Sequence, residues 1–356
     1  MKEPKIRFKG FEGKWEESTI GKVTSVNRGV RVTRKNLSDH GLYPVYQNTD
    51  YPMGYYNRYN VESNNPFVII GGSAGLIGFC DKDFWAADDC AYFSDSVKID
   101  KFYLYCMLLN KSSEIKKNVR GSSVPRLDRQ VINDLNISLP SIKEQQSIAS
   151  YFQHLDALIQ STTKKIESLK QVKAASLQSM FPQEGETTPR VRFKGFEGEW
   201  EKVSFGQFGS VAMCKRIFKD QTMDKGEVPF YKIGTFAMEP DAYISKELFI
   251  EYKSKFSFPQ KGDILISAAG TIGRTIQYNG EDAYFQDSNI VWLKHGNEID
   301  NTFLMYIYSL VKWNGIEGAT IKRLYNNIIL ETEFLLPPVE EQRAIASFFT
   351  ILDRKI

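Results

Sequence analysis

The stretch that organises this chain is RFKGFEGKWE at residues 7–16, which returns 185 residues later as RFKGFEGEWE at residues 192–201. Nine of the ten positions are identical. A second block carries Leu-Pro, Glu-Gln and Ile-Ala-Ser in residues 139–156 and again in residues 336–353, at an offset of 197. Self-similarity of this kind indicates that one structural unit has been duplicated. The sequence therefore predicts two copies of one scaffold.

The interiors between these blocks have diverged, although a skeleton survives in them. The matches that remain are glycines, turn residues and apolar anchors, such as Ala74–Gly78 with Ala269–Gly273. Short runs of β-branched and aromatic residues, bounded by Gly, Asn and Asp, are typical of short strands. One helix is expected at residues 101–109 and its counterpart at 302–310. Each interior is thus predicted to be a mixed α+β domain with mainly short strands.

A long helix is predicted after Pro140. Ser141 followed by Glu144 is a capping-box signature, and neither Gly nor Pro occurs again before Pro182. Apolar or borderline residues recur along it in steps of four and three, at Ile148, Phe152, Leu155, Ile159, Thr162, Ile166 and Leu169. This spacing indicates a coiled-coil seam that needs a partner helix. The alternative is a long surface helix that lies on its own domain.

Composition sets the broad class. With 42% hydrophobic and 25% charged residues, 356 residues can form two domains with real cores. A cytoplasmic protein is expected, because no apolar run approaches the roughly 18 residues of a membrane span and the N-terminus lacks a signal-peptide pattern. Forty-six basic and 43 acidic residues leave a net charge of +3, which neither demands nor excludes nucleic acid. Four scattered cysteines and three histidines argue against a zinc site or a disulfide framework.

Three motifs suggest chemistry, but each is better explained by structure. The glycine-rich run at residues 71–78 could cradle a phosphate, yet no Gly-Lys-Ser/Thr follows and the second copy keeps only its last two glycines, so a tight turn between strands is favoured. Asn64–Phe67 only faintly resembles the Asn-Pro-Pro-Tyr/Phe motif of amino-methyltransferases. Asp88 and Asp89 could bind a metal or act as acid and base, but a turn or cap is favoured. The sequence offers no pattern that supports catalysis.

Basic and amide side chains are better candidates for contacts with nucleic acid. Amides suit adenine edges, lysine suits guanine, and arginine beside hydroxyl residues can grip phosphate. A solvated face, or an ion pair at a strand end for Arg126 and Arg323, remains the alternative. The candidates in the first copy are Arg28, Arg31, Gln47, Asn48, Ser122 and Arg126, and those in the second are Lys215, Arg216, Lys232, Thr320, Lys322 and Arg323.

The paired openings at residues 7–16 and 192–201 and the paired helix starts at 139–156 and 336–353 resemble the specificity subunit of type I restriction-modification systems. The resemblance covers essentially the whole chain. It implies two target-recognition domains that each read one half of a bipartite double-stranded DNA sequence, separated by conserved helices that pack antiparallel as a ruler. It also implies that the chain has no active site and binds no cofactor itself. Two methyltransferase subunits would use S-adenosylmethionine to methylate adenine, and restriction subunits would use ATP and Mg²⁺ to translocate and cleave DNA.

We therefore expect an α+β fold with two tandem target-recognition domains, an internal pseudo-twofold repeat and long conserved helices. The first six candidate residues are assigned to one half-site and the last six to the other. The expected segments are a first recognition domain at 1–140, a helical spacer at 141–181, a linker at 182–190, a second recognition domain at 191–338 and the start of a second conserved helix at 339–356.

Two alternatives from other classes stay open. One is a stand-alone DNA methyltransferase fused to a recognition domain, which would require motifs for cofactor and adenine that the chain does not show. The other is a coiled-coil adaptor without DNA contacts. Since only three residues follow Asp353, whereas the first helix runs another 25 residues beyond Asp156, the second helix is expected to be truncated. An exposed apolar seam on the first helix, and self-association through it, are then expected.

Overall fold

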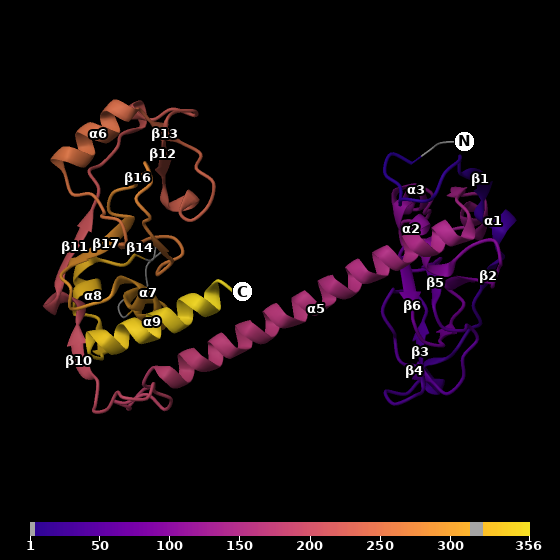
Figure 1. Ribbon diagram of the computed structural model, residues 1–356, viewed down its shortest axis with the longest axis horizontal. Coiled ribbons are helices and arrows are strands. Elements are labelled where there is room, and N and C mark those ends of the chain that lie inside the picture. Colours follow the sequence, from indigo (N-terminus) through magenta and orange to yellow (C-terminus); the bar gives the residue numbers. More distant parts are fainter. Residues whose placement is uncertain (1–3, 314–322) are drawn as a thin grey trace. The chain divides into compact units, whose positions relative to one another are not determined.

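The fold is taken from a computed structural model, which describes residues 4–313 and 323–356 (Figure 1). The chain forms two compact units, Met1–Thr162 and Thr163–Ile356, here called unit 1 and unit 2. The long helix α5 (Ile142–Met180) begins in unit 1 and ends in unit 2. Each unit contains one copy of the repeat and is described by itself.

Unit 1 is a mixed domain of short strands and short helices. Its strands form three antiparallel or mixed sheets, in the orders β1-β9, β2-β8-β5-β6 and β4-β3-β7. The elements are β1 (Glu16–Thr19), α1 (Ile20–Val23), β2 (Val26–Arg28), β3 (Tyr43–Tyr46), β4 (Tyr55–Tyr56), β5 (Asn65–Ile69), β6 (Ile77–Cys80), β7 (Trp85–Ala86), β8 (Cys90–Phe93), α2 (Lys101–Asn110), α3 (Ser112–Lys117), α4 (Arg129–Asn133) and β9 (Asn136–Leu139).

Unit 2 repeats this topology strand for strand. Its sheets have the orders β10-β18, β11-β17-β14-β15 and β13-β12-β16, and β12 pairs in parallel with β16 as β3 does with β7. The elements are β10 (Glu201–Ser204), β11 (Gly209–Met213), β12 (Val228–Tyr231), β13 (Tyr243–Ile244), α6 (Lys246–Lys255), β14 (Ile264–Ser267), β15 (Thr275–Gln277), β16 (Tyr284–Phe285), β17 (Ile290–His295), α7 (Asn301–Leu310), α8 (Asn326–Glu331), β18 (Glu333–Leu336) and α9 (Val339–Asp353).

Sequence patterning explains the central elements. Strand β5 is apolar along most of its length and buried at every position, as a strand covered on both faces should be. Helices α2 and α7 both begin after an aspartate, because the carboxylates of Asp100 and Asp300 accept hydrogen bonds from backbone N–H groups of the first turn. The glycine-rich run lies in the loop of the antiparallel β5–β6 hairpin, so the expected turn between strands is confirmed.

Each unit has two apolar clusters. The larger one packs the four-stranded sheet against its helix, α2 in unit 1 and α7 in unit 2, and reaches the long helices through Ala149 and Phe349. The smaller one joins residues of the four-stranded sheet to the three-stranded sheet, and it contains Phe67 and Phe84 in unit 1 and Trp292 and Tyr284 in unit 2. Each three-stranded sheet is therefore packed on its four-stranded sheet in a cluster separate from the one that reaches the long helices.

Helix α5 matches the expected helix at 141–181, but the predicted capping box is only half formed. The Ser141 hydroxyl accepts a hydrogen bond from the backbone N–H of Glu144 at 3.3 Å. The carboxylate of Glu144 does not return to Ser141, since it binds Arg7 instead. The capping-box signature predicted the start of the helix correctly, but the predicted partner of the Glu144 side chain was wrong.

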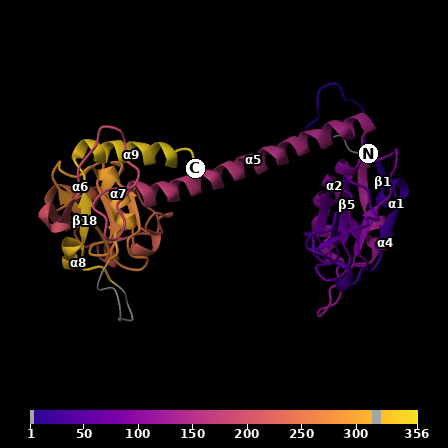
Figure 2. The same ribbon diagram turned by 90° about the horizontal axis from the view of Figure 1, so that it is seen from below.

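In unit 2 the last turns of α5 pack against α9. Leu169 and Leu177 border the apolar cluster that contains Phe349 and Leu352, and Lys173 Nζ lies 2.5 Å from Asp353 Oδ1. Phe181 is 6.0 Å from Phe349 between ring centroids. Later residues of α5 thus meet earlier residues of α9, and the two helices run antiparallel, as Figures 1 and 2 show.

The predicted fold class, two tandem α+β domains with a long helix between them, is confirmed. Among the described residues, no helix combines the length and apolar character needed to cross a membrane. All four cysteines are free thiols.

Candidate nucleic-acid interface

The repeated blocks form an ion pair that holds the opening motif against the long helix in each unit. Arg7 donates to both carboxylate oxygens of Glu144, at 2.8 and 2.7 Å, and Arg192 binds Glu341 in the same two-pronged way at 2.7 Å. Both glutamates are almost fully buried, and hydrogen bonding to Glu341 raises the pKa of the Arg192 guanidinium. Bidentate guanidinium–carboxylate pairs are the strong form of such contacts. The two blocks are thus one structural device, here called the clamp.

In each opening motif, the carbonyl of a glycine also accepts a hydrogen bond from the clamp arginine. Arg7 Nη1 donates to the carbonyl of Gly13 and Arg192 Nη1 to that of Gly198, both at 2.5 Å. Gly13 has φ +84° and Gly198 φ +83°, which is left-handed backbone that favours glycine. The near-identity of the two openings is therefore explained by the geometry needed to enclose one guanidinium.

The glutamine after each clamp glutamate ties the long helix to the helix beside it. Gln145 accepts from the backbone N–H of Asp100 at 2.9 Å and donates to the carbonyls of Lys98 and Pro140. Gln342 accepts from Asp300 N–H at 2.8 Å and donates to the carbonyls of Glu298 and Pro337. Both side chains are 1% exposed and bind main-chain atoms at every point. The clamp glutamines thus hold each interior through hydrogen bonds to its backbone.

Three of the six predicted contact residues of unit 1, Arg28, Asn48 and Arg126, lie where four loops meet. This place is here called the first loop cluster and is defined by Asn48, Gly71–Ser73, Asp88–Asp89 and Arg126. Ser73 N–H donates to the carbonyl of Asn48, and Gly72 N–H to that of Pro125. A Cβ on Gly71 would lie 2.3 Å from Oδ1 of Asp89, so the glycine leaves room for this carboxylate in its present position. The cluster is a backbone-bonded platform rather than a set of separate loops.

Two arginines project from this platform. Arg126 Nη1 pairs with Asp89 Oδ1 at 2.9 Å, while its side chain remains 59% exposed. Arg28 donates from Nε to the carbonyl of Asp88 at 2.7 Å and is also exposed. For Arg126 the structure shows the strand-end ion pair that the sequence left open, and it still leaves most of the guanidinium accessible. Asp88 and Asp89 serve this turn, as expected from the sequence.

The second loop cluster, in unit 2, has the same skeleton and is defined by Lys232–Ile233, Ala269–Gly270, Gln286–Asn289 and Arg323. Leu324 N–H donates to Ala268 O and Ala268 N–H to Asn289 O, which repeat the bonds from Leu127 to Ile70 and from Ile70 to Asp89. Ala269 bridges Arg323 as Gly71 bridges Arg126. The backbone framework of the two clusters is therefore conserved between the units.

Side-chain pairing differs between the clusters. In the second, Arg216 pairs with Asp287 at 2.8 Å, and Arg323 donates to the carbonyl of Ser288 and lies over the Tyr325 ring. Lys232 pairs with Asp241 at 2.8 Å. The position that holds Asp89 in the first cluster holds Asn289 in the second. One framework thus presents two different sets of charges and hydrogen-bonding groups.

The other predicted residues are less closely tied to the clusters. Arg31 and Ser122 are exposed, and within the described residues neither makes a side-chain hydrogen bond or ion pair; Gln47 is half-buried beside Asn48. Lys215 lies 5.1 Å from the Phe256 ring centroid. Thr320 and Lys322 lie outside the described residues.

The tyrosines aligned at the ends of β3 and β12 belong to the packing of the units. Burial raises the pKa of Tyr46, whose hydroxyl lies 3.8 Å from Cys80 Sγ, and burial also raises the pKa of Tyr231. These residues anchor the loops that follow them. The divergent residues after each tyrosine, Gln47–Asn48 and Lys232–Ile233, are the ones that reach the clusters.

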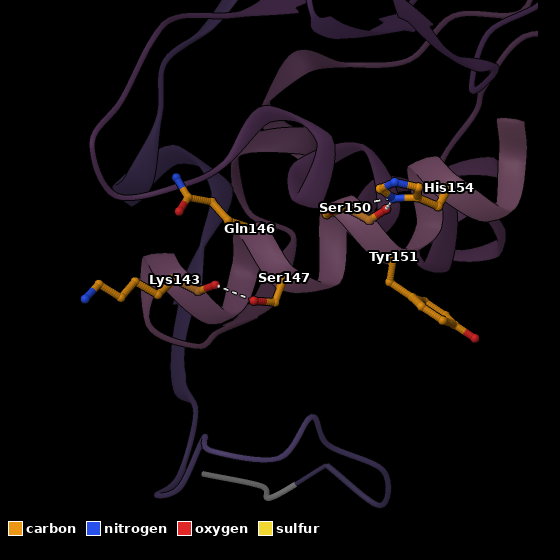
Figure 3. Close-up of a pocket in the computed structure, with 6 residues that line it drawn as sticks. All are labelled: Lys143, Gln146, Ser147, Ser150, Tyr151 and His154. Carbon is orange, nitrogen blue, oxygen red and sulfur yellow. Dashed lines mark hydrogen bonds between the residues drawn. The ribbon is translucent and has the colours of Figure 1, made fainter.

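A shallow hollow lies along the first turns of α5, lined by Lys143, Gln146, Ser147, Ser150, Tyr151 and His154 (Figure 3). All six residues come from the same helix, and the hydrogen bonds drawn there run within it, such as Ser147 Oγ to Lys143 O at 3.0 Å. Over residues 4–313 and 323–356, no group of three His, Cys, Asp or Glu side chains is arranged to hold a metal. The hollow is a helix surface and lacks the converging groups of an active site.

Comparison with known proteins matches both units to one family. The family described as "Type I restriction modification DNA specificity domain" matches twice, over residues 12–171 and 197–356. The chain belongs to this family. The family assignment confirms the interpretation of the chain as a specificity subunit rather than a stand-alone enzyme.

Relatives and solved structures of the family span nearly the whole chain. A Haemophilus influenzae protein named "Putative type I restriction enzyme specificity subunit" is 35% identical over 98% of this chain and 88% of its own length. The MjaVIII specificity subunit of Methanocaldococcus jannaschii is 23% identical over 96% of this chain and 87% of its own. The crystal structure of the Mycoplasma genitalium S subunit covers 99% of this chain and 92% of its own, with 18% identity and a TM-score of 0.71. That structure supports the fold.

Several residues of this specificity-family site were not among the sequence candidates. Asp287 and Gln286 position Arg216 and the backbone of Ile233, and Asp89 positions Arg126. Arg216 and Asp287 lie 71 residues apart, so no local pattern could have paired them. The paired aspartates of unit 1 and Arg126 were each noted in the sequence, but the pairing of Asp89 with Arg126 was not predicted.

Proposed function

We propose that this chain reads a two-part DNA sequence, with the first loop cluster contacting one half-site and the second loop cluster the other. In this proposal residues 1–140 and 191–338 are the recognition domains, and residues 141–181 hold them in register. One observation carries the proposal: a chain of the DNA specificity family builds the same loop framework twice and places different polar side chains on each copy. A pair of readers with distinct preferences needs this arrangement.

Energetics favour two readers over one. A mismatched base pair costs about 1–3 kcal/mol, so a half-site of a few base pairs stands out poorly against the many competing sites of a genome. Two half-sites held in one molecule add their discrimination. Duplication of one domain, followed by divergence of its loops, supplies two readers with different preferences without a new scaffold.

The ion pairs in the clusters are compatible with phosphate or base contacts. Exposed pairs such as Arg126–Asp89 and Arg216–Asp287 are each worth about 0–1 kcal/mol, because water screens them. An arginine can therefore exchange its carboxylate for a phosphate or a guanine edge at little cost. The carboxylate meanwhile keeps the guanidinium at the rim of the cluster in the free protein.

Catalysis is assigned to partners. We propose that two methyltransferase subunits bind the chain and methylate adenine from S-adenosylmethionine at the site that it selects, and that restriction subunits use the same selection to cleave unmodified DNA. The chain itself selects the DNA sequence on which these partners act. Partner subunits that close around the duplex would contribute part of the phosphate neutralisation, which fits a net charge of only +3.

The test is to map methylated adenines by long-read sequencing in a host that carries this chain with its methyltransferase subunits. Gln47→Ala or Arg126→Ala should relax or change one half of the methylated motif, and Lys232→Ala or Arg216→Ala the other half. Arg190→Ala is a matched control, because Arg190 is an exposed arginine paired with Glu186 in the linker. Unchanged motifs in all four variants would refute the assignment of the clusters.

Two further measurements separate this function from its alternatives. Methylation by the chain without methyltransferase subunits would favour the fused-enzyme alternative. A chain that assembles with the methyltransferase subunits while the complex shows no sequence preference would favour the adaptor. In purified complexes, losing one phosphate contact should reduce the slope of log affinity against log salt by about 1.

A further inference from the structure

The two loop clusters carry different groups at one matched position, an aspartate in the first cluster and an asparagine in the second. The carbonyl of Asp89 accepts from Ile70 N–H at 2.8 Å, and that of Asn289 accepts from Ala268 N–H at 2.7 Å. Each residue directly precedes a core strand, β8 or β17. Matching backbone hydrogen bonds therefore fix the point from which both side chains extend. A carboxylate leaves this point in unit 1 and an amide in unit 2.

The carboxylate of the first cluster is already engaged. Asp89 Oδ1 pairs with Arg126 Nη1 at 2.9 Å, in space that Gly71 leaves free because it has no Cβ. In unit 2 the residue at the position of Gly71 is Ala269, since it bridges Arg323 as Gly71 bridges Arg126. The Cβ of Ala269 occupies the space in which the carboxylate lies in unit 1. The asparagine of the second cluster is thus not in a position to repeat the ion pair.

A longer turn gives the arginine of the second cluster another partner. Three residues, 87–89, separate β7 from β8, whereas four residues, 286–289, separate β16 from β17. Ser288 in the longer turn has φ +52°, a left-handed conformation that is uncommon for a residue with a side chain. Its carbonyl accepts from Arg323 Nη2 at 2.9 Å. The arginine therefore needs no acceptor on the neighbouring Asn289.

The amide of Asn289 is left without a partner in the free protein. The residue is half-buried, and its side chain makes no hydrogen bond within the described part of the chain. A side-chain amide offers one acceptor and two donors on a planar group. In the major groove of DNA, adenine presents the N7 acceptor beside the N6 amino donor, and an asparagine amide can bind both at once. The unpaired group on this cluster thus has the chemistry of an adenine reader.

We propose that Asn289 is a specificity-determining residue of the second half-site. Its Oδ1 accepts a hydrogen bond from N6 of one adenine, and its Nδ2 donates to N7 of the same base. This inference rests on the proposed function and adds to it one residue and one base. At the matched position of the first half-site the carboxylate of Asp89 is committed to Arg126, so the two half-sites are read by different chemistry there.

The first test needs no change in the protein. It uses the complex of the chain with its methyltransferase subunits and a duplex that carries the methylated motif. Each adenine of the second half-site, on either strand, is replaced in turn by 7-deazaadenine, which lacks the N7 acceptor and keeps its base pairing. One of these replacements should weaken binding about fivefold, because one of the two hydrogen bonds to Asn289 is lost.

The variant Asn289→Ala shows whether this residue makes the contact. It should bind the natural duplex about tenfold more weakly, and the sensitive 7-deazaadenine should weaken its binding no further, because N7 then has no partner to lose. Asn279→Ala is the matched control. Asn279 is an exposed asparagine of unit 2, and its neighbour Tyr278 bonds Asp263 at the opposite end of β14 from the cluster. The control should respond to both duplexes as the native complex does.

The variant Asn289→Asp tests the identity of the base. A carboxylate accepts hydrogen bonds but cannot donate to N7, and it suits the N4 amino group of cytosine. Long-read mapping of methylated adenines should therefore show one position of the second half-site change from adenine to cytosine. The first half-site should stay as it is. A structural role alone would not exchange one base for another.

Two results would overturn the proposal. One is that no 7-deazaadenine in the second half-site weakens binding by the native complex. The other is that the sensitive replacement weakens binding by the Asn289→Ala complex as much as by the native one. Arg216→Ala and Lys232→Ala separate this failure from failure of the proposed function. If they alter the second half of the motif, only the adenine contact is refuted; if they also leave it unchanged, the second loop cluster does not read DNA.

Discussion

Unit 1 and unit 2 share the bidentate ion pairs and the glutamine hydrogen bonds of their clamps and differ in the side chains of their loop clusters. Arg7 and Arg192 bind Glu144 and Glu341 with matching geometry, whereas Arg126 pairs with an aspartate and Arg323 with a carbonyl. The comparison separates two roles of the sequence. Buried groups that hold the long helices tolerate little change, and exposed groups on the loop clusters are free to diverge.

The clamp itself is the first place to test this comparison. Glu144→Ala and Glu341→Ala each leave a partly buried arginine without its carboxylate, which we expect to cost about 3 kcal/mol in the unit that carries the change. Hydrogen exchange followed by mass spectrometry measures the two units separately within the full chain. Glu340→Ala is the matched control, because Glu340 is an exposed neighbour of Glu341. Equal exchange in Glu341→Ala and Glu340→Ala would contradict the structural role of the clamp.

Phe152 on α5 and Phe349 on α9 occupy matching positions of the repeat, since each lies four residues after the start of Ile-Ala-Ser. Their substitution should affect the stability of the two units differently. Phe349→Ala removes a fully buried ring and should destabilise unit 2 by about 3 kcal/mol or more. Phe152→Ala removes a ring that is 44% exposed and should cost unit 1 about 1 kcal/mol or less. The same exchange experiment measures both. Equal losses would mean that Phe152 is covered in solution.

The clamp glutamines should have equal effects of intermediate size. Gln145→Ala or Gln342→Ala removes three hydrogen bonds to buried or partly buried main-chain groups, and we expect a loss of about 2 kcal/mol in the affected unit. Gln146→Ala, at the exposed position beside Gln145, should change the stability of unit 1 little. A much larger loss in one unit than in the other would show that the two clamps are not equivalent.

The smallest expected effect is a change in the reactivity of the Cys106 thiol on α2. Burial and, to a lesser degree, the carboxylate of Asp156 raise the pKa of Cys106 to about 11. Because the folded state favours the protonated thiol, its stabilising contribution is complete below the pKa of an unfolded cysteine and is lost as pH rises through about 11. Alkylation of Cys106 should therefore accelerate between pH 9 and 11.

The Asp156→Asn variant tests the cause of that shift. It should raise the alkylation rate of Cys106 modestly at pH 9, because it removes a neighbouring negative charge. Cys80, Cys90 and Cys214 are buried and should label more slowly than Cys106 under native conditions. Peptide mapping distinguishes the four sites. An unchanged rate in Asp156→Asn would place the carboxylate too far from the thiol to matter.

Much of the fold could be predicted because its signals are local or duplicated. The repeat identified two copies, the spacing of Gly and Pro delimited α5 to within a residue, and N-terminal aspartates mark α2 and α7. The partner of Glu144 could not be predicted, since Arg7 lies 137 residues away and a local capping box offered a simpler role. Contacts over such separations leave no short-range pattern.

The candidate site was predicted only in part, because contacts between residues far apart in the sequence give no local signal. Residue type and repeat position identified Arg28, Asn48 and Arg126, which reach one loop cluster. They also identified Arg216, Lys232 and Arg323, which reach the other. The residues that position them, Asp89, Asp287 and Gln286, were not among the candidates. Whether the loop clusters contact DNA bases remains a prediction.

Gln145 and Gln342 contact the interiors through backbone atoms only, and this has a consequence for heredity. A mutation that changes an interior side chain can leave these hydrogen bonds intact, because they join the clamp glutamines to main-chain atoms. Likewise, an entire interior could be inherited from a related gene, provided that its main chain enters and leaves at the clamp. New loop surfaces are thus one genetic step away from a working scaffold.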